Sequence, residues 1–404
     1  MRIAVIGGGA SGMSTAYLLD KQEHHVTVFE REPMLGGHIR TLNQNIQPNQ
    51  SNCDQMLECG VLEFPNVFYN FVALMEELEV ELKPVRLGSS LFPKNGNHFL
   101  SAVTIDKNYS GFQRWLEHLR FDAIHARSLG LWLETRFAEK ENFCNQPLSK
   151  YVTDRNISQI WLKLLTMYSY SIPFELIDDF PAELALPMLR DYIAVDWLRV
   201  VGGVYSYIHK ILSRFKGEVI LNAAIANIFR SSDLVKITLF DGENLEFDKV
   251  VFATPPDQVM ALLADPDDHE IKRFSVWKAN YAHTTVHQDI SMYESHHIQN
   301  PAEFDFFQTD IQWGYNSYLN QLCGISSPNH YFLSFQLEKL IAKEKIIHIQ
   351  KHHTPLYTTE AFRYRDQVVK TNGENHTYYA GAYLGDGLHE GAIASAFRVA
   401  QLIG

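Results

Sequence analysis

The first thirty residues read as a strand, a glycine-rich turn, a helix and a second strand. An apolar run over Arg2–Ile6 leads directly into the hexapeptide GGGASG at positions 7–12. A helical pattern continues through Leu19, and a second apolar run, Val26–Phe29, ends at Glu30. This is a βαβ unit with G-x-G-x-x-G at its first turn and an acid after its second strand. It predicts an α/β fold built around a Rossmann-type domain.

The glycines, the helix N-terminus and the acid of this unit each have a physical role in binding a dinucleotide. Gly7 permits the tight turn, Gly9 lets a pyrophosphate approach the backbone, and Gly12 lets helix and strand pack closely. The helix N-terminus offers unpaired N–H groups and a partial positive charge to the phosphates. Glu30 is placed to accept hydrogen bonds from the adenosine ribose. The predicted nucleotide-binding residues of the unit are Gly7, Gly9, Ala10, Ser11, Gly12, Glu30 and Arg31.

The segment that follows indicates which dinucleotide is bound. It reads Gly36-Gly37-His38-Ile39-Arg40-Thr41. This resembles the GG-[R/H]-x-x-T element of the flavin-containing amine oxidase superfamily, the group that includes protoporphyrinogen oxidase-like and phytoene desaturase-like proteins. The resemblance implies non-covalent FAD, with Gly37, His38 and Arg40 beside the cofactor.

Other segments resemble the same superfamily along the whole chain. Met56–Gly60 resembles the strand beside the flavin ring, Val219–Ile228 the strand that holds the adenine, and Val250–Pro255 the "VVxAxPP" strand. The last block, from Thr377 onward, resembles the closing strand, loop and helix. The resemblance places the following residues near FAD: Gly60, Val61, Ile225, Ala253, Gly381, Tyr383, Glu390, Gly391 and Ala392.

The second half resembles a bacterial branch of predicted NAD/FAD-binding, amine-oxidase-like proteins. The matching segments are Val286–Asp289, Tyr318–Leu322 and His352–Tyr357. The chain departs from most of the superfamily at Ala382, where relatives carry an acid that binds a ribityl hydroxyl, although the branch also reads Gly-Ala-Tyr. Lys278 lies in the region of the lysine that many amine oxidases place near the flavin, and we do not assign it that role.

Composition excludes several partners. The 404 residues are 46% hydrophobic and 20% charged, as in ordinary globular proteins. A formal net charge of −12 argues against nucleic acid, because phosphate binding needs a basic surface. The sequence shows no membrane span and no room for a signal peptide before Arg2. The four cysteines show no metal-ligand spacing, so we expect no metal and a cytoplasmic location.

The pattern predicts two interleaved domains. We expect an FAD-binding domain over residues 1–85, 195–255 and 346–404, and an α+β substrate domain over 86–194 and 256–345. Predicted helices are Phe68–Leu78, Leu129–Phe137, Ile160–Tyr170, Tyr205–Phe215 and one ending at Leu402. Predicted strands include Met56–Gly60, Val219–Ile228, Tyr281–His287, Phe304–Phe307, Thr377–Tyr383, and a hairpin over Leu234–Phe252 that turns at Asp241-Gly242.

Catalysis in such a protein needs few side chains, because the flavin accepts the hydride at N5 and the protein orients the donor bond. A basic group helps if a proton must leave first. We take His389, Glu390, Tyr383 and His283 as candidates, with His287 and His353 as further histidines. His389-Glu390 has a structural alternative, a pair that caps the last helix.

Three classes of function remain open at this stage. The first is an FAD-dependent oxidoreductase that acts on a C–N or C–C bond of a hydrophobic or aromatic small molecule. The second is a desaturase or isomerase for a lipid or isoprenoid, and the third is a catalytically silent flavin-binding protein. We expect an aromatic, amide-rich cavity rather than one suited to polyamines, formed by Phe304, Phe306, Phe307, Trp313, Tyr315, Asn316, Tyr318 and Tyr383.

Overall fold

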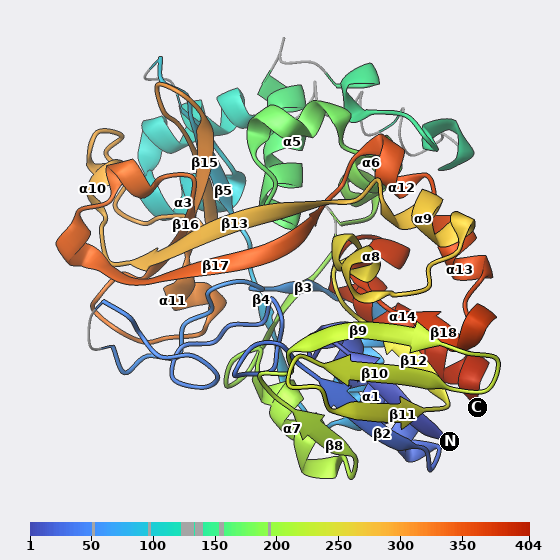
Figure 1. The fold of residues 1–404 in the computed structure, drawn as a ribbon. Helices are drawn as coiled ribbons and strands as arrows, with labels where there is room; N and C mark the ends of the chain where they lie inside the picture. Colours follow the sequence, from blue (N-terminus) through green and yellow to red (C-terminus); the bar gives the residue numbers. More distant parts are fainter. Residues whose placement is uncertain (51–52, 96–97, 123–132, 134–139, 153–156, 193–194) are drawn as a thin grey trace.

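A five-stranded parallel sheet organises the nucleotide-binding half of the chain (Figure 1). The computed structural model describes residues 1–404 except 51–52, 96–97, 123–132, 134–139, 153–156 and 193–194. Strand order is β18-β12-β1-β2-β8, with β1 in the middle and every pair parallel. The bounds are β1 Arg2–Ile6, β2 His25–Phe29, β8 Glu218–Ile220, β12 Lys249–Phe252 and β18 Thr377–Tyr379. Residues 3–5 of β1 are fully buried, as expected for a strand covered on both faces.

Helices cover this sheet. The first helix, α1 (Ala10–Lys21), packs against the last, α14 (His389–Ile403), so both ends of the chain meet here. Two more helices, α2 (Tyr69–Glu77) and α7 (Ser206–Arg214), complete the layer and share one apolar core with β1 and β2. A small antiparallel sheet, β11-β10-β9, lies beside the parallel sheet, where Phe247 meets Phe29 edge to face. Its strands are β9 Ile225–Arg230, β10 Val235–Leu239 and β11 Asn244–Phe247.

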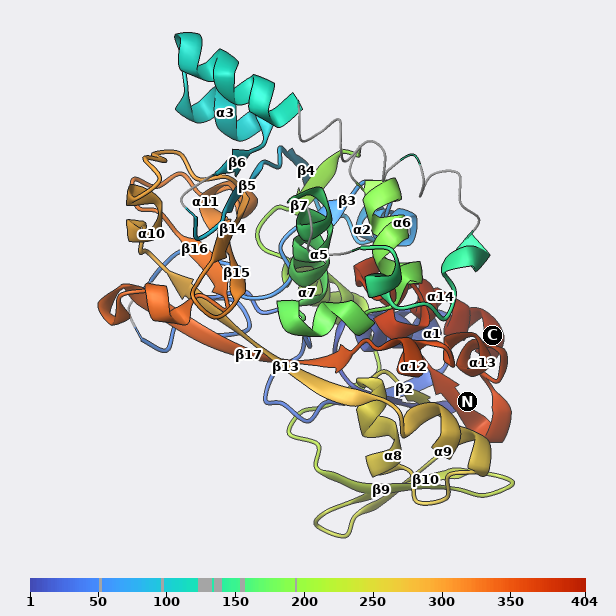
Figure 2. The ribbon, with the colours of Figure 1, turned by 90° about the horizontal axis from the view of Figure 1, so that it is seen from above.

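A seven-stranded mixed sheet forms the other half, in the order β17-β13-β16-β15-β14-β5-β6. Its bounds are β5 Ser89–Phe92, β6 Phe99–Leu100, β13 Lys278–His287, β14 Phe304–Gln308, β15 Trp313–Tyr318, β16 Phe332–Phe335 and β17 Ile346–Leu356. Figure 2 shows the long strands β13 and β17 running from this sheet toward α8 and α12. Helix α5 (Ile157–Tyr170) packs on the sheet through Tyr168, which stacks on Phe304.

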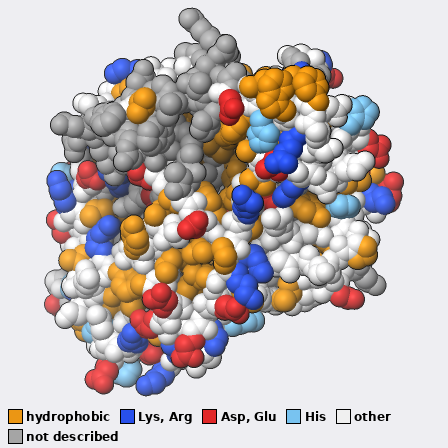
Figure 3. Space-filling model, turned by 180° about the vertical axis from the view of Figure 1, so that it is seen from behind, with side chains coloured by type: hydrophobic (Ala, Val, Ile, Leu, Met, Phe, Trp, Pro, Cys, Tyr) orange, Lys and Arg blue, Asp and Glu red, His pale blue; other side chains and the backbone are white. Residues whose placement is uncertain are grey.

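Shorter elements connect the two halves. A three-stranded antiparallel sheet comprises β3 Phe64–Pro65, β7 Trp197–Val200 and β4 Leu82–Val85. The other helices include α3 Ala102–Asn108, α6 Ala182–Tyr192, α8 Val259–Leu262, α9 Asp268–Phe274, α10 Ser291–Glu294, α11 Leu319–Leu322, α12 Thr359–Phe362 and α13 Arg365–Lys370. Within the described part of the chain, no helix has the length and apolarity needed to cross a bilayer. On the face drawn in Figure 3, basic and acidic side chains are interspersed.

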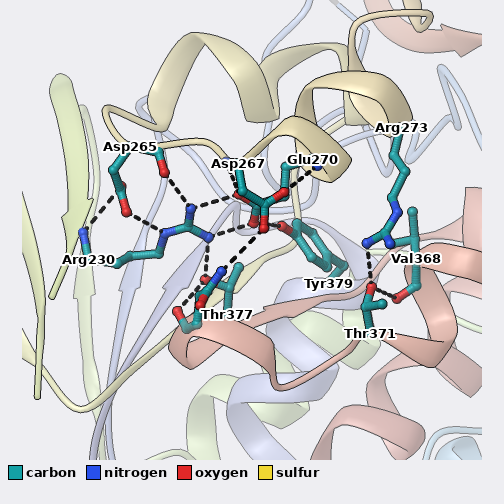
Figure 4. Close-up of polar contacts among 10 residues, drawn as sticks. Arg230, Asp265, Asp267, Glu270, Arg273, Val368, Thr371, Thr377 and Tyr379 are labelled. Carbon is teal, nitrogen blue, oxygen red and sulfur yellow. Dashed lines mark hydrogen bonds and ion pairs between the residues drawn. The ribbon is translucent and has the colours of Figure 1, made fainter. Parts of the chain in front are cut away.

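A buried arginine joins β9, α9 and β18 (Figure 4). Arg230 makes a bidentate ion pair with Glu270, at 2.6 and 2.7 Å, and its Nε donates to Asp265 at 3.1 Å. Its Nη1 also donates to the Thr377 hydroxyl at 3.0 Å, and the Tyr379 hydroxyl donates to Glu270 at 2.9 Å. The cluster therefore fixes the edge of the parallel sheet to the segment that leads into β13.

Most predicted elements are present, and several needed correction. Met56–Gly60 is not a strand, because its backbone makes only a bridge between Thr41 and Glu58. Val219–Ile228 is two strands, β8 and β9, which belong to different sheets. The second arm of the predicted hairpin is also divided, into β11 and β12. The predicted strand to Tyr383 ends at Tyr379, and Leu129–Phe137 lies outside the described residues apart from position 133.

The observed sheets bear on the expected domain boundary at residue 346. Strand β17 begins there and pairs antiparallel with β13 along its length. A boundary at 346 would separate two hydrogen-bonded strands, so we propose that the substrate domain extends through Leu356.

Candidate active site

A cavity of about 1360 Å³ lies between the parallel and seven-stranded sheets. Residues from both ends of the chain and from its middle line it. Fifteen of the predicted site residues are among them: Gly7, Gly9, Ala10, Ser11, Glu30, Arg31, Gly37, His38, Arg40, Gly60, Val61, Ile225, Ala253, Gly381 and Ala392. Tyr383 and His389 also line the cavity, whereas Gly12, His283, Glu390 and Gly391 are outside its described lining.

The turn between β1 and α1 leaves bare backbone at one end of the cavity. A Cβ on Gly12 would lie 1.8 Å from the carbonyl oxygen of Gly7, so this glycine is needed for helix and strand to pack. Gly9 faces Gly37, and a Cβ on Gly9 would lie 3.5 Å from the Gly37 Cα. Among the described residues, no side chain caps the N-terminus of α1. Its N–H groups are therefore available to an anionic ligand such as a pyrophosphate.

Glu30 and Arg40 shape the same end. The Glu30 carboxylate accepts hydrogen bonds from the backbone N–H groups of Gly8, at 2.7 Å, and Glu32, at 2.9 Å. Arg40 is buried, and its Nη1 donates to the carbonyl oxygen of Leu35 at 3.1 Å. Burial lowers the pKa of Arg40, and the Glu30 carboxylate opposes that shift. Arg40 thus stabilises the loop that carries Gly37.

Two of the histidines that line the cavity, His352 and His38, are in their neutral form. The His352 Nε2 donates to the carbonyl oxygen of Cys59 at 2.8 Å, and burial lowers the pKa of His352 to about 3. The His38 Nε2 donates to the carbonyl oxygen of His353 at 2.7 Å, and burial lowers the pKa of His38 as well. These rings therefore hold the chain in place rather than supply positive charge.

The pair His389-Glu390 separates into two roles. His389 lines the cavity, packs edge to face on Phe64 and Phe71, and hydrogen-bonds the Tyr207 hydroxyl at 2.9 Å. Burial lowers the pKa of His389 to about 3, so the ring is neutral. Glu390 points elsewhere: its carboxylate accepts from the backbone N–H groups of residues 70 and 71, at 2.9 and 3.0 Å, at the start of α2. Glu390 thus stabilises α2, a helix distant in the sequence, and not the last helix.

The other two catalytic candidates differ in position. The Tyr383 hydroxyl is buried at the cavity and has no hydrogen-bond partner among the described residues. Burial raises its pKa, so it remains a neutral donor. His283 is exposed on β13, away from the cavity lining.

Aromatic side chains line the cavity as predicted, but most of them belong to residues that were not predicted. Of the eight expected residues, Tyr315 and Tyr383 line the cavity. Phe307 packs on the opposite face of the sheet against Phe92, and Asn316 accepts a hydrogen bond from Ser334 within a buried network. Strand alternation explains these two, because neighbouring residues face opposite sides. Phe304, Phe306 and Trp313 share the face of Tyr315 but pack into the apolar core beside it. The cavity instead gains Tyr168, Tyr170, Trp197 and Tyr357.

One acid at this wall was missed by the sequence reasoning. Glu63 lines the cavity, and its Oε1 accepts a hydrogen bond from the Tyr168 hydroxyl at 2.7 Å. A sequence signal existed, since Glu63 is the sole charged residue between Cys59 and Glu76. A single acid in an otherwise apolar segment indicates a polar side chain that is turned toward the interior of the protein.

The bare-backbone turn, the acid after β2 and the adjoining aromatic cavity define a flavin-type dinucleotide-binding protein. The sequence matches the flavin containing amine oxidoreductase family over residues 10–286. This chain belongs to that family. The expected Rossmann-type fold and the expected FAD cofactor are thereby confirmed, and the glycine cradle and Glu30 fit such a group.

Solved structures of similar fold have varied functions. A CLA-producing fatty acid isomerase from P. acnes aligns with a TM-score of 0.73 and 16% identity, covering 100% of this chain and 99% of that chain. A putrescine oxidase double mutant aligns with a TM-score of 0.70 and 14% identity, covering 100% and 99%. Identities this low show the fold alone.

Curated sequences give partial matches. The 4,4'-diapophytoene desaturase of Staphylococcus aureus (strain MRSA252) is 24% identical over 311 residues, or 68% of this chain and 59% of that protein. A protein of Acanthamoeba polyphaga mimivirus is 41% identical over 64 residues, or 16% of this chain and 13% of that protein. The match therefore spans less than two thirds of the length of either relative.

Proposed function

We propose that this protein is an FAD-dependent oxidoreductase that oxidises a C–N or C–C bond of a hydrophobic or aromatic small molecule by taking a hydride from a C–H on one carbon of that bond. The observation that carries the proposal is the continuity of the cavity, which joins the glycine cradle at Gly9 to the tyrosine-rich wall at Tyr168 and Tyr315. FAD, when bound, supplies the hydride acceptor at its N5 atom.

The roles of the chain's own residues follow from the geometry. The backbone at Gly7–Ser11 and the Glu30 carboxylate bind the cofactor's phosphates and ribose. Aromatic side chains at the other end favour an apolar donor, since each Å² of apolar surface buried contributes about 25 cal/mol. They also exclude water from the donor bond. The free Tyr383 hydroxyl and the neutral His389 ring can orient a polar atom of the substrate.

A second candidate is desaturation or isomerisation of a lipid or isoprenoid. Two similarities favour it: the partial sequence match to a diapophytoene desaturase and the fold match to a fatty acid isomerase. A large apolar cavity would suit either kind of substrate.

The test is spectroscopic. We expect the purified protein to be yellow and to release FAD on denaturation. Anaerobic addition of hydrophobic amines, amino acids or lipids should bleach the flavin, and the class of donor that bleaches it separates the two candidates. A colourless protein that does not bind added FAD would contradict the proposal. Rapid bleaching by putrescine or spermidine, with none by hydrophobic donors, would show that the substrate class is wrong.

A further inference from the structure

One helix beside the seven-stranded sheet carries its apolar side chains on the outside. The helix covers residues 111–122, and Figure 2 shows it, in teal beside α3, projecting past β6 at the edge of that sheet. Its exposed apolar side chains are Phe112, Trp115, Leu116 and Leu119, which are 70%, 55%, 37% and 46% exposed. These positions follow the i, i+3, i+4, i+7 spacing, so they form one stripe along the helix, here called the outer stripe.

The opposite side of this helix is the side that contacts the protein. Glu117 is buried, and its carboxylate lies 3.3 Å from the His98 Nε2 and 2.6 Å from the Arg120 Nη1. Phe121, one turn later, packs against the apolar cluster that contains Phe307. With 3.6 residues per turn, positions 117 and 121 lie opposite the outer stripe. A surface helix ordinarily turns its apolar face to the core, and this helix does the reverse.

The size and composition of the outer stripe indicate what covers it. Four side chains offer a few hundred Å², the size of patch that on a monomer often marks an interaction site. A stable interface between proteins buries about 800 Å² on each partner, so two copies joined by this stripe alone fall short. A lipid surface requires less, because an amphipathic helix in the headgroup region is held by its own apolar face. Trp115, which stacks on Phe112 with ring centroids 5.6 Å apart, is the residue type enriched at that depth.

The charged residues beside the outer stripe form pairs of opposite sign. Arg114 pairs with Asp106 at 2.8 Å, and Arg120 pairs with Glu117 at 2.6 Å. Over residues 111–122 the two arginines are balanced by two acids, so the helix brings no net charge to a surface. The formal net charge of −12 for the whole chain opposes attraction to anionic lipid. The lipid surface that fits this arrangement is therefore a zwitterionic one.

We propose that the outer stripe docks the protein on the surface of a zwitterionic lipid bilayer, with the helix lying in the plane of the headgroups. The apolar side chains enter the boundary between headgroups and acyl chains, while Glu117 and Phe121 keep the helix attached to the protein. This inference goes beyond the proposed function and is independent of it, since it concerns neither the cavity nor the flavin.

Sedimentation of the full chain with phosphatidylcholine vesicles tests the docking. The unmodified protein should bind the vesicles, and the double variant Phe112→Ser with Trp115→Ser should need at least tenfold more lipid for half of it to bind. Both side chains are exposed, so their loss opens no cavity in the core. Tyr69→Ser, at a position 72% exposed on α2, is the matched control and should change the lipid requirement less than twofold. Equal binding by the double variant, or no binding by the unmodified protein, would overturn the inference.

A second measurement identifies the part of the protein that meets the lipid. Phosphatidylcholine brominated on its acyl chains should quench the tryptophan fluorescence of the bound protein, and Trp115→Phe should lose at least half of that quenching while it still binds. Undiminished quenching in Trp115→Phe would show that another surface enters the bilayer. Binding confined to vesicles that contain phosphatidylglycerol would show attraction by charge and overturn the zwitterionic surface. A dimer without lipid, which the double variant converts to a monomer, would make the outer stripe a contact between two copies and contradict the inference.

Discussion

At the scale of single residues, Glu30 has two tasks. Its carboxylate holds the backbone of residues 8 and 32, and it faces the cavity. We expect Glu30→Ala to weaken FAD binding by about 10- to 150-fold, because charge-assisted hydrogen bonds contribute about 1.5–3 kcal/mol. Equilibrium dialysis measures this. Glu246→Ala, exposed on β11, is the control, and unchanged affinity in Glu30→Ala would show that Glu30 does not bind the ribose.

Glu390 lies in the first turn of α14 but stabilises the start of α2, and its replacement should reveal that role. Because its carboxylate accepts two backbone N–H groups at the start of α2, Glu390→Ala should lower the free energy of unfolding by about 1–2 kcal/mol. The rate of flavin reduction by a given donor should stay the same. Denaturant titration and stopped-flow spectroscopy measure the two quantities, with Glu76→Ala, exposed on α2, as control. A slower reduction with unchanged stability would instead make Glu390 catalytic.

At the scale of elements, the Arg230 cluster joins three of them with one side chain. Removing the charge of its main partner leaves a buried guanidinium less compensated, so Glu270→Gln should cost about 3 kcal/mol of unfolding free energy. Asp268→Asn, exposed on the same helix, should cost less than about 1 kcal/mol. Denaturant titration of both variants checks the difference, and equal losses would contradict it.

The same ion pair predicts a pH dependence. Burial alone would raise the pKa of Glu270, but Arg230, the Asp267 backbone N–H and the Tyr379 hydroxyl together outweigh it, so this pKa is below 4.5 in the folded protein. A lowered folded-state pKa gives stability that is present above the unfolded-state value and lost as the pH falls through the folded-state pKa. The parent should therefore lose more stability than Glu270→Gln when the pH falls below 4.5. Parallel loss in both proteins would argue against the pair.

Elements with strong local signals could be predicted from the sequence. β1 occupies the predicted residues, and α1 and β2 lie within a residue or two of theirs, because apolar runs and a glycine turn are local features. The strands that pair with a given strand, by contrast, can lie far from it in the sequence. The apolar run at 219–228 was predicted to be one strand, but it forms two. The sequence does not reveal that β8 joins the parallel sheet and β9 the antiparallel one.

At the scale of the whole molecule, the same limit applies to the site. The glycine cradle was predictable because its residues are close in sequence. The substrate wall was predicted less well, because Tyr168, Tyr315 and Glu63 come from three distant segments that only the fold brings together. Which face of β15 meets the cavity depends on its register with β14 and β16, and the composition of the strand does not encode this.

The contribution of residues 377–404 to the whole fold can be tested by truncation. A chain ending at residue 376 lacks β18, which pairs with β12, and α14, which packs on α1. We expect this shortened chain to bind no FAD and to aggregate, because an inner strand becomes an open edge and an apolar helix face is uncovered. Flavin fluorescence and size-exclusion chromatography measure both effects, and a monomeric yellow product would contradict the expectation.

The order of strands in the parallel sheet has a consequence for synthesis of the protein. Translation delivers β1 first, but its neighbour β12 emerges much later, and β18 emerges later still. On the ribosome, the inner strand β12 therefore stays unpaired on one side until residues 377–379 have been made. Because Gly381 and Ala392 line the cavity, the flavin site is complete only after these residues have been made, and the interval before that is when the unfinished chain depends most on chaperones.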